Sequence, residues 1–139
     1  MKRRLNSMML VAVMFSLTAC TRVGAPLVPA PPSEVVAGTF GGVLSVEGTG
    51  MEGLLVLTVV DGRYQAVFDS ESFGFEASGE GRFRGAHLEL VLAYEMDCRG
   101  ELRMRGIFLA DKGQWDGELV ASDCTGDAAG EFHFQRRAR

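Results

Sequence analysis

Proline is missing from most of this 139-residue chain, and glycine is abundant where proline is missing. All four prolines lie between residues 26 and 32, whereas 17 of the 18 glycines lie between Gly38 and Gly130. Proline cannot donate a hydrogen bond to a sheet ladder, and glycine permits tight turns. A long region with glycine and without proline is typical of short strands joined by tight turns.

Motifs for catalysis and nucleotide binding are also missing. There is no GxSxG, SxxK, P-loop, GxGxxG or EF-hand pattern. The two histidines, His87 and His133, alternate with apolar neighbours and have no nucleophile beside them, so we expect them on an outward face. The acidic stretch from Asp69 to Glu80 shows no sign of the cleft that paired catalytic carboxylates need, and we interpret it as a solvated strand face and turn. We therefore expect no enzymatic activity, no catalytic residue and no cofactor.

Cysteine is scarce, with three residues in the chain. Cys98 and Cys124 are far apart in sequence and lack the CxxC or HxxxH spacing of a zinc site. Asp123 and Asp127, on either side of Cys124, offer too few oxygen ligands for a calcium loop. We expect no metal.

The first twenty residues, MKRRLNSMMLVAVMFSLTAC, combine three basic residues, an apolar run and small residues before Cys20. This order is typical of a secretory signal, and the run is too short to span a bilayer comfortably. The segment LTAC resembles the bacterial lipobox, which implies a lipoprotein signal peptide over residues 1–19 and lipid attachment at Cys20. An ordinary signal peptide with an incidental cysteine is the alternative.

Export changes the interpretation of the other two cysteines. If Cys20 carries lipid, Cys98 and Cys124 form an even pair, which in an oxidising compartment predicts a disulfide. The bond would close a loop of about 25 residues, and a cross-link of that length stabilises a fold by about 3 to 4 kcal/mol.

Removal of the leader would leave 11 basic residues against 18 acidic ones. That balance argues against nucleic acid as a partner, because phosphate binding needs a basic stripe. Residues 20–35 contain all the prolines and predict a semi-rigid tether between the membrane and a domain over 36–139. Thr21 replaces the aspartate associated with inner-membrane retention, which favours the outer membrane, with the domain in the periplasm or on the cell surface.

Apolar and polar residues alternate with period two through the domain. The turns between these segments predict eight strands, near residues 36–47, 52–60, 63–69, 72–81, 86–95, 100–109, 113–121 and 128–136. Short connections favour an antiparallel up-and-down barrel, which buries the apolar face and leaves no exposed edge. A sandwich would need longer crossovers, and a membrane-spanning barrel would not tolerate outward charges such as Glu89, Arg103 and Glu118.

The pattern Gly-x-aromatic-x-Gly occurs in GTFGG, GRFRG and GQWDG, with a partial copy in GEF. In a strand these positions share one face, so each ring can lie over flanking glycines where a barrel strand bends. We therefore expect Phe40, Tyr94, Trp115 and Phe132 to face the barrel interior or a ligand within it. Gly-x-Trp is also the signature of lipocalins, but those carry it on the first strand, and here it falls on the seventh.

The glycine-bounded aromatic strand starts, the DCTG segment and the final G-x-F-x-F strand together resemble small glycine-rich β-barrel lipoproteins of bacteria, with a calycin-like barrel and no known activity. From the whole sequence we expect a monomeric, membrane-tethered, non-enzymatic binding or interaction module at the cell envelope, with an envelope protein as a partner. The alternatives are a carrier of a small hydrophobic ligand and an inhibitor of an exogenous hydrolase. The Ser-Gly-x-x-Tyr loop of lysozyme inhibitors is missing, since Ser78-Gly79 is followed by Glu80, Gly81 and Arg82.

Overall fold

The computed structural model describes residue 29 and residues 31–138. The signal sequence over 1–19, the lipid site Cys20 and most of the tether lie outside the described residues. Within the described part of the chain, no helix is long and apolar enough to cross a bilayer.

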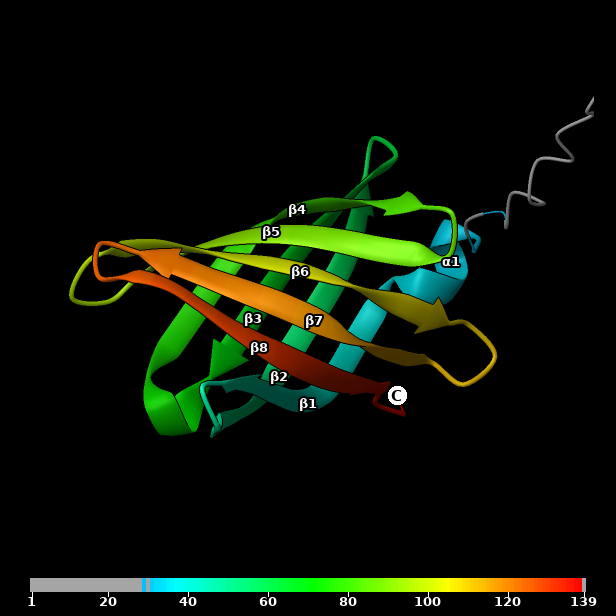
Figure 1. Ribbon diagram of the computed structural model, residues 1–139. Helices are drawn as coiled ribbons and strands as arrows, with labels where there is room; N and C mark the ends of the chain where they lie inside the picture. Colours follow the sequence, from blue (N-terminus) through cyan, green and yellow to red (C-terminus); the bar gives the residue numbers. More distant parts are fainter. Residues whose placement is uncertain (1–28, 30, 139) are drawn as a thin grey trace, which may run out of the picture.

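Eight antiparallel strands form a closed barrel in which each strand pairs with its sequence neighbours and β1 pairs with β8 (Figure 1). This is the up-and-down barrel that the sequence predicts. The strands are β1 (Gly38–Val46), β2 (Thr49–Val60), β3 (Arg63–Ser70), β4 (Phe75–Arg84), β5 (His87–Glu95), β6 (Arg99–Leu109), β7 (Gln114–Asp123) and β8 (Gly126–Arg136).

Side chains alternate between the barrel interior and its outer surface along every strand. In β5, for example, Leu88, Leu90 and Leu92 are buried whereas Val91 is exposed. Two of the hairpins are closed by two-residue turns whose residues all have positive φ: Glu47 with Gly48, and Asp61 with Gly62. Such turns match the right-handed twist of the strands, so they fix the register of β1 with β2 and of β2 with β3.

The structure differs from the expected tether at its C-terminal part. We expected an extended spacer through residue 35 and a strand from residue 36, but Ser33–Val36 form a short helix, α1. The Val36 side chain has 0% exposure and belongs to the core. A second short helix, η1 (Glu71–Phe73), ends at Gly74 with φ of 58°, which is why β4 begins at residue 75 rather than 72.

The aromatic rings do not lie over the flanking glycines of their own motif, where we expected them from the sequence. Gly85 and Gly113, the outer glycines of two motif copies, have φ of 61° and 59° and lie in turns rather than in strands. The rings instead cover glycines of the neighbouring strand: Phe134 lies against Gly42, and a Cβ at Gly100 would lie 2.1 Å from Cζ of Tyr94. Glycine is thus needed where a ring from the adjacent strand occupies the space of a side chain.

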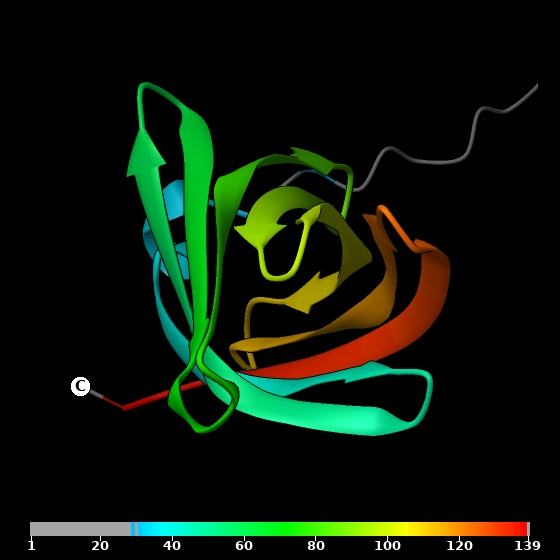
Figure 2. The same cartoon turned by 90° about the vertical axis from the view of Figure 1, so that its left-hand side faces the viewer.

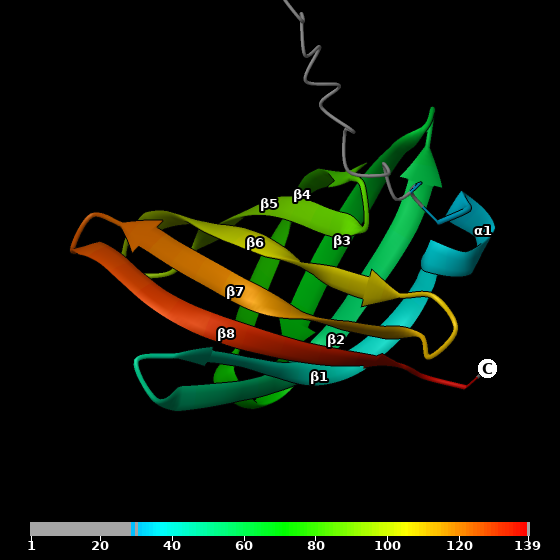
Figure 3. The same ribbon diagram turned by 45° about the vertical axis from the view of Figure 1, so that its right-hand side comes forward.

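The two ends of the barrel differ. α1 and the C-terminal end of β8 lie at the same end, which we call the α1 end (Figure 3). The β1–β2, β3–β4, β5–β6 and β7–β8 connections lie at the opposite end, which we call the mouth. Figure 2 looks into the mouth, where the β5–β6 turn bends over the opening.

Candidate functional site

The four aromatic residues expected to face the interior come from four strands. Phe40 in β1 and Trp115 in β7 have 0% exposure, and Phe132 in β8 has 4%. Tyr94 in β5 is partly exposed and packs against the core from the mouth side. The indole Nε1 of Trp115 donates a hydrogen bond to the carbonyl oxygen of Gly106, 3.1 Å away, so the buried donor is satisfied.

Aromatic side chains occupy the middle of the barrel. The ring centroids of Trp115 and Phe132 are 4.2 Å apart, and those of Phe68 and Phe134 are 5.9 Å apart. Phe68 also contacts Phe75, which continues the packing towards the mouth. These side chains fill the space that a ligand held deep in the barrel would need.

The α1 end is closed by a set of contacts between the first and last described elements. The Arg136 guanidinium donates hydrogen bonds to the carbonyl oxygens of Ala37, at 2.8 Å, and Val35. It also lies over the Phe40 ring, 4.8 Å from the centroid. Together with buried Val36, these contacts hold α1 against the barrel and close this end to a ligand.

The mouth, in contrast, contains a hollow of about 360 Å³. Its volume lies within the range of small-molecule sites, about 300 to 1,000 Å³. Apolar side chains line it, with polar and acidic groups at the rim; we call it the mouth pocket. The lining residues are Leu44, Val46, Glu47, Thr49, Met51, Phe75, Tyr94, Met96, Leu102, Ala121, Asp123, Thr125, Gly126, Asp127 and Ala128.

Asp123 is the best-defined polar group of the mouth pocket. Its carboxylate accepts hydrogen bonds from the Thr125 amide, at 2.7 Å, and from the Thr125 hydroxyl, at 2.5 Å. The Thr125 hydroxyl and then the Thr125 amide lower the pKa of Asp123, so the group is ionised at neutral pH. Burial raises the pKa of Tyr94, and the nearby Asp123 carboxylate raises it further, so the phenol is neutral.

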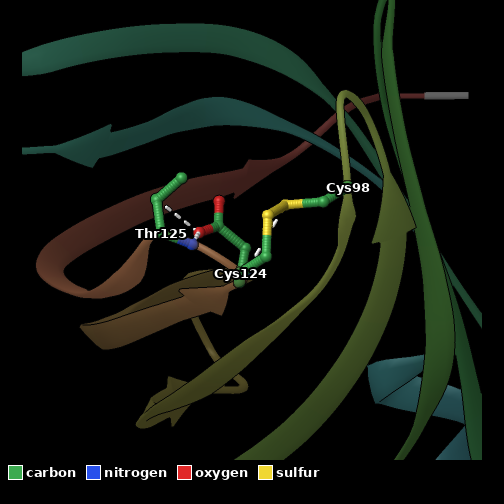
Figure 4. The surroundings of a disulfide bond; sticks show 4 residues. Cys98, Cys124 and Thr125 are labelled. Carbon is green, nitrogen blue, oxygen red and sulfur yellow. Dashed lines mark hydrogen bonds between the residues drawn. A yellow bond between two sulfur atoms is a disulfide. The ribbon is translucent and has the colours of Figure 1, made fainter.

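A disulfide joins two turns beside this pocket. The sulfur atoms of Cys98 and Cys124 are 2.08 Å apart, which confirms the predicted pairing (Figure 4). The bond connects the β5–β6 turn to the β7–β8 turn, and the Cys124 amide also contacts the Cys98 sulfur at 3.3 Å. It therefore ties Asp123 and Thr125 to the turn that follows Tyr94.

The same disulfide determines whether a potential metal site can form. Within residues 29 and 31–138, one group of three residues has the side chains and spacing to hold a metal ion. Cys98, Asp123 and Cys124 place their potential ligand atoms within 4.8 Å of one another. Both sulfurs are bonded to each other, however, so neither is a thiolate, the form in which cysteine binds a metal. The group does not make a metal centre in this redox state.

The other candidate residues lie on the outer surface. His133 pairs with Asp116 of the neighbouring strand, and His87 lies near the α1 end of β5. Asp69 and Glu76 are register partners on β3 and β4 whose side chains are exposed. Glu80 pairs with Arg63 at 3.6 Å. These groups have the solvated environment expected of them from the sequence.

The three arginines near the disulfide pair with glutamates. Arg105 lies 3.4 Å from Glu89 across β5 and β6, and Arg99 lies 3.7 Å from Glu95. Arg103 contacts Glu101 of its own strand at 2.5 Å. The basic group is thus compensated by neighbouring carboxylates rather than left as an anion-binding patch.

A larger hollow, of about 600 Å³, lies outside the barrel across β1, β2 and η1. It is a shallow surface trough beside Gly41 and Leu54, with Glu52, Asp69 and Arg137 among its polar lining groups. The mouth pocket is the better candidate because its lining includes inward apolar side chains that a ligand would remove from water.

The fold and the pocket define a class: an up-and-down β-barrel with a packed interior, one closed end and one open end. Comparison of the chain with protein-family models, with curated proteins and with solved structures gave no match.

Sequence reasoning considered Asp123 only as a calcium ligand, rejected that role, and missed its place in the mouth pocket. The predicted strand stopped at residue 121, whereas β7 runs to Asp123. Extending the alternation of Trp115, Leu119 and Ala121 by two residues puts Asp123 on the inward face. That extension, together with the turn after it, was the signal that could have identified this residue.

Proposed function

We propose that this protein is a non-enzymatic binding module of the bacterial cell envelope, anchored by lipid at Cys20, whose mouth pocket receives the apolar part of a ligand. The observation that carries the proposal is the contrast between the two halves of the barrel. Side chains fill the middle and the α1 end, whereas the mouth retains an apolar hollow of about 360 Å³.

The mouth pocket combines features that support binding. Leu44, Phe75 and Leu102 provide buried apolar surface at its base. Met96, 60% exposed, stands in the β5–β6 turn at its rim, where a flexible thioether can adapt to a ligand. The disulfide fixes two of the turns around it, so little order has to be gained on binding.

A neutral amphiphile such as 1-octanol tests the binding site. The chain from residue 29 contains all eight strands of the barrel, and circular dichroism first checks that it folds. We expect 1-octanol to bind and to shift the NMR signals of Leu44, Tyr94 and Ala121. The Ala121→Phe variant should fill the pocket and abolish binding. Ala129→Phe, on the outward face of β8, is the matched control and should bind normally.

Octanol that shifts no mouth signals, or that binds the Ala121→Phe variant as well as the parent chain, would refute the proposed site. The anchor is tested separately in the full chain. Cys20→Ser should release the protein from the membrane fraction of a bacterial host, and unchanged membrane association would contradict lipid attachment at this residue.

A further inference from the structure

The mouth of the barrel is negatively charged as well as hollow. Acidic side chains crowd the mouth half of the barrel, and two arginines accompany them. The acidic residues are Glu47, Glu52, Asp69, Glu71, Glu76, Glu95, Asp97, Glu101, Asp123 and Asp127, and the basic ones are Arg99 and Arg103.

Neither arginine pairs with Asp123, the acidic group best defined in the pocket. Arg99 is engaged by Glu95 and Arg103 by Glu101, and Arg103 also interacts with Asp127. Among the described residues, no basic side chain lies within salt-bridge distance of Asp123. The partners of Asp123 are all neutral donors: the hydroxyl and amide of Thr125, the phenol of Tyr94 and the backbone amide of Gly126.

We propose that the ligand of the mouth pocket is a small lipophilic cation, in which an ammonium group meets Asp123 at the rim and an apolar body fills the hollow behind it. This inference rests on the proposed function and adds the charge of the ligand to it. An ammonium group would give Asp123 a counter-ion, which it does not have among the described residues. Aromatic faces favour cations as well, and Tyr94 and Phe75, whose centroids are 5.2 Å apart, lie beside Asp123 in the lining.

An anionic amphiphile fits less well. A carboxylate at the same place would face Asp123 directly, with Glu47 and Asp127 also on the rim. Like charges at a partly desolvated rim repel one another, and hiding the apolar chain does not remove that repulsion. The pocket should therefore discriminate between ligands of equal apolar size by the sign of their charge.

Four probes with matched structures test the inference by isothermal titration calorimetry: octylammonium, 1-octanol, octanoate and methylammonium, all below their aggregation concentrations. We expect octylammonium to bind about tenfold more tightly than 1-octanol, since one partly screened charge pair contributes a difference of that order. Octanoate should bind more weakly than 1-octanol, and methylammonium should not bind measurably.

Asp123→Asn is the diagnostic variant, because asparagine keeps the oxygen that accepts from Thr125 while losing the charge. It should bring the ratio of the octylammonium affinity to the 1-octanol affinity, measured in the same variant, close to one. Asp111→Asn, in the β6–β7 turn at the opposite end, removes the same net charge and should preserve the preference.

The outcomes separate the two proposals. Octanol binding at the mouth without a preference for octylammonium overturns the charge inference and leaves the proposed function standing. Equal loss of preference in Asp111→Asn would overturn it too, because net charge rather than Asp123 would then be responsible. Tight binding of methylammonium would also overturn the inference, because the site would then bind a cation without an apolar body. If none of the three probes with an eight-carbon chain binds, the proposed function itself is refuted.

Discussion

Trp115 in β7 is fastened to the neighbouring strand through the carbonyl oxygen of Gly106, which accepts its indole hydrogen bond at 3.1 Å inside the barrel. Gly106 pairs with Gly117, and a Cβ on Gly117 would lie 2.5 Å from the Gly106 Cα. Because both facing residues are glycines, the β6 and β7 backbones can approach closely beside the Trp115 indole. The first two predictions follow from this close packing.

Trp115→Phe should destabilise the barrel by about 2 to 4 kcal/mol, because it leaves the Gly106 carbonyl without its partner and creates a small cavity. Urea unfolding followed by far-ultraviolet circular dichroism measures this loss. Phe73→Leu, at a position 47% exposed, is the control and should change stability by less than about 0.5 kcal/mol. Equal unfolding midpoints for Trp115→Phe and the parent would contradict the structural role of the indole.

Gly117→Ala should destabilise the barrel by about 1 to 3 kcal/mol, since the new methyl group would lie 2.1 Å from the Arg105 carbonyl oxygen. The comparison is Gly50→Ala in β2, where the nearest atom, Cγ1 of Val43, is 3.4 Å from the new Cβ. Thermal unfolding of the two variants should separate them clearly. A larger loss of stability in Gly50→Ala than in Gly117→Ala would contradict the close contact between the β6 and β7 backbones at Gly117.

Replacing Cys98 and Cys124 together by serine should lower the stability by about 3 kcal/mol, because the unfolded chain loses a cross-link that closes 26 residues of separation. The barrel should still close, since the ladder pairs of β5–β6, β6–β7 and β7–β8 do not depend on the bond. Guanidinium unfolding gives the stability, and amide exchange of the two turns reports the local loosening. Complete unfolding of the variant in buffer would mean that the barrel depends on the bond far more than we expect.

Asp123 should make the barrel less stable in acid. Its folded-state pKa lies below the usual value of 3.8, so the stabilisation is present above that value and is lost as the pH falls through the folded pKa. The loss between pH 6 and pH 3 should be smaller in Asp123→Asn than in the parent, and Asp111→Asn should behave as the parent does. Thermal midpoints across that range decide it, and parallel curves for parent and Asp123→Asn would contradict the prediction.

The sequence predicted the barrel because alternation was strong where one face had to be buried. Leu88, Leu90 and Leu92 could be placed on one face by their period alone, and the structure confirms them there. α1 could not be predicted in the same way. It is four residues long and is held by Arg136, from the far end of the chain, so its cause is tertiary contact rather than local propensity.

The mouth pocket could be predicted less well than the core, for a related reason. Its lining is shared among residues near the ends of seven strands, where alternation gives way to turn chemistry. Glu47 was expected in the first strand and lies in the β1–β2 turn, whereas Asp123 was expected beyond the seventh strand and is the last residue of β7. Its place on the inward face depends on how far β7 continues past Ala121. Sequence patterns define a strand's centre better than its last two residues.

The closure of β1 on β8 limits how this barrel can recognise another molecule. Within the described residues each strand has a neighbour on both sides, so over the paired lengths the peptide groups of the sheet already bond to one another. Recognition by β-augmentation, in which a peptide joins an open sheet as an extra strand, needs a vacant edge and is therefore closed to this scaffold. Selectivity must come from side chains and turn geometry, and the turns around the mouth are the parts that can vary without reopening the barrel.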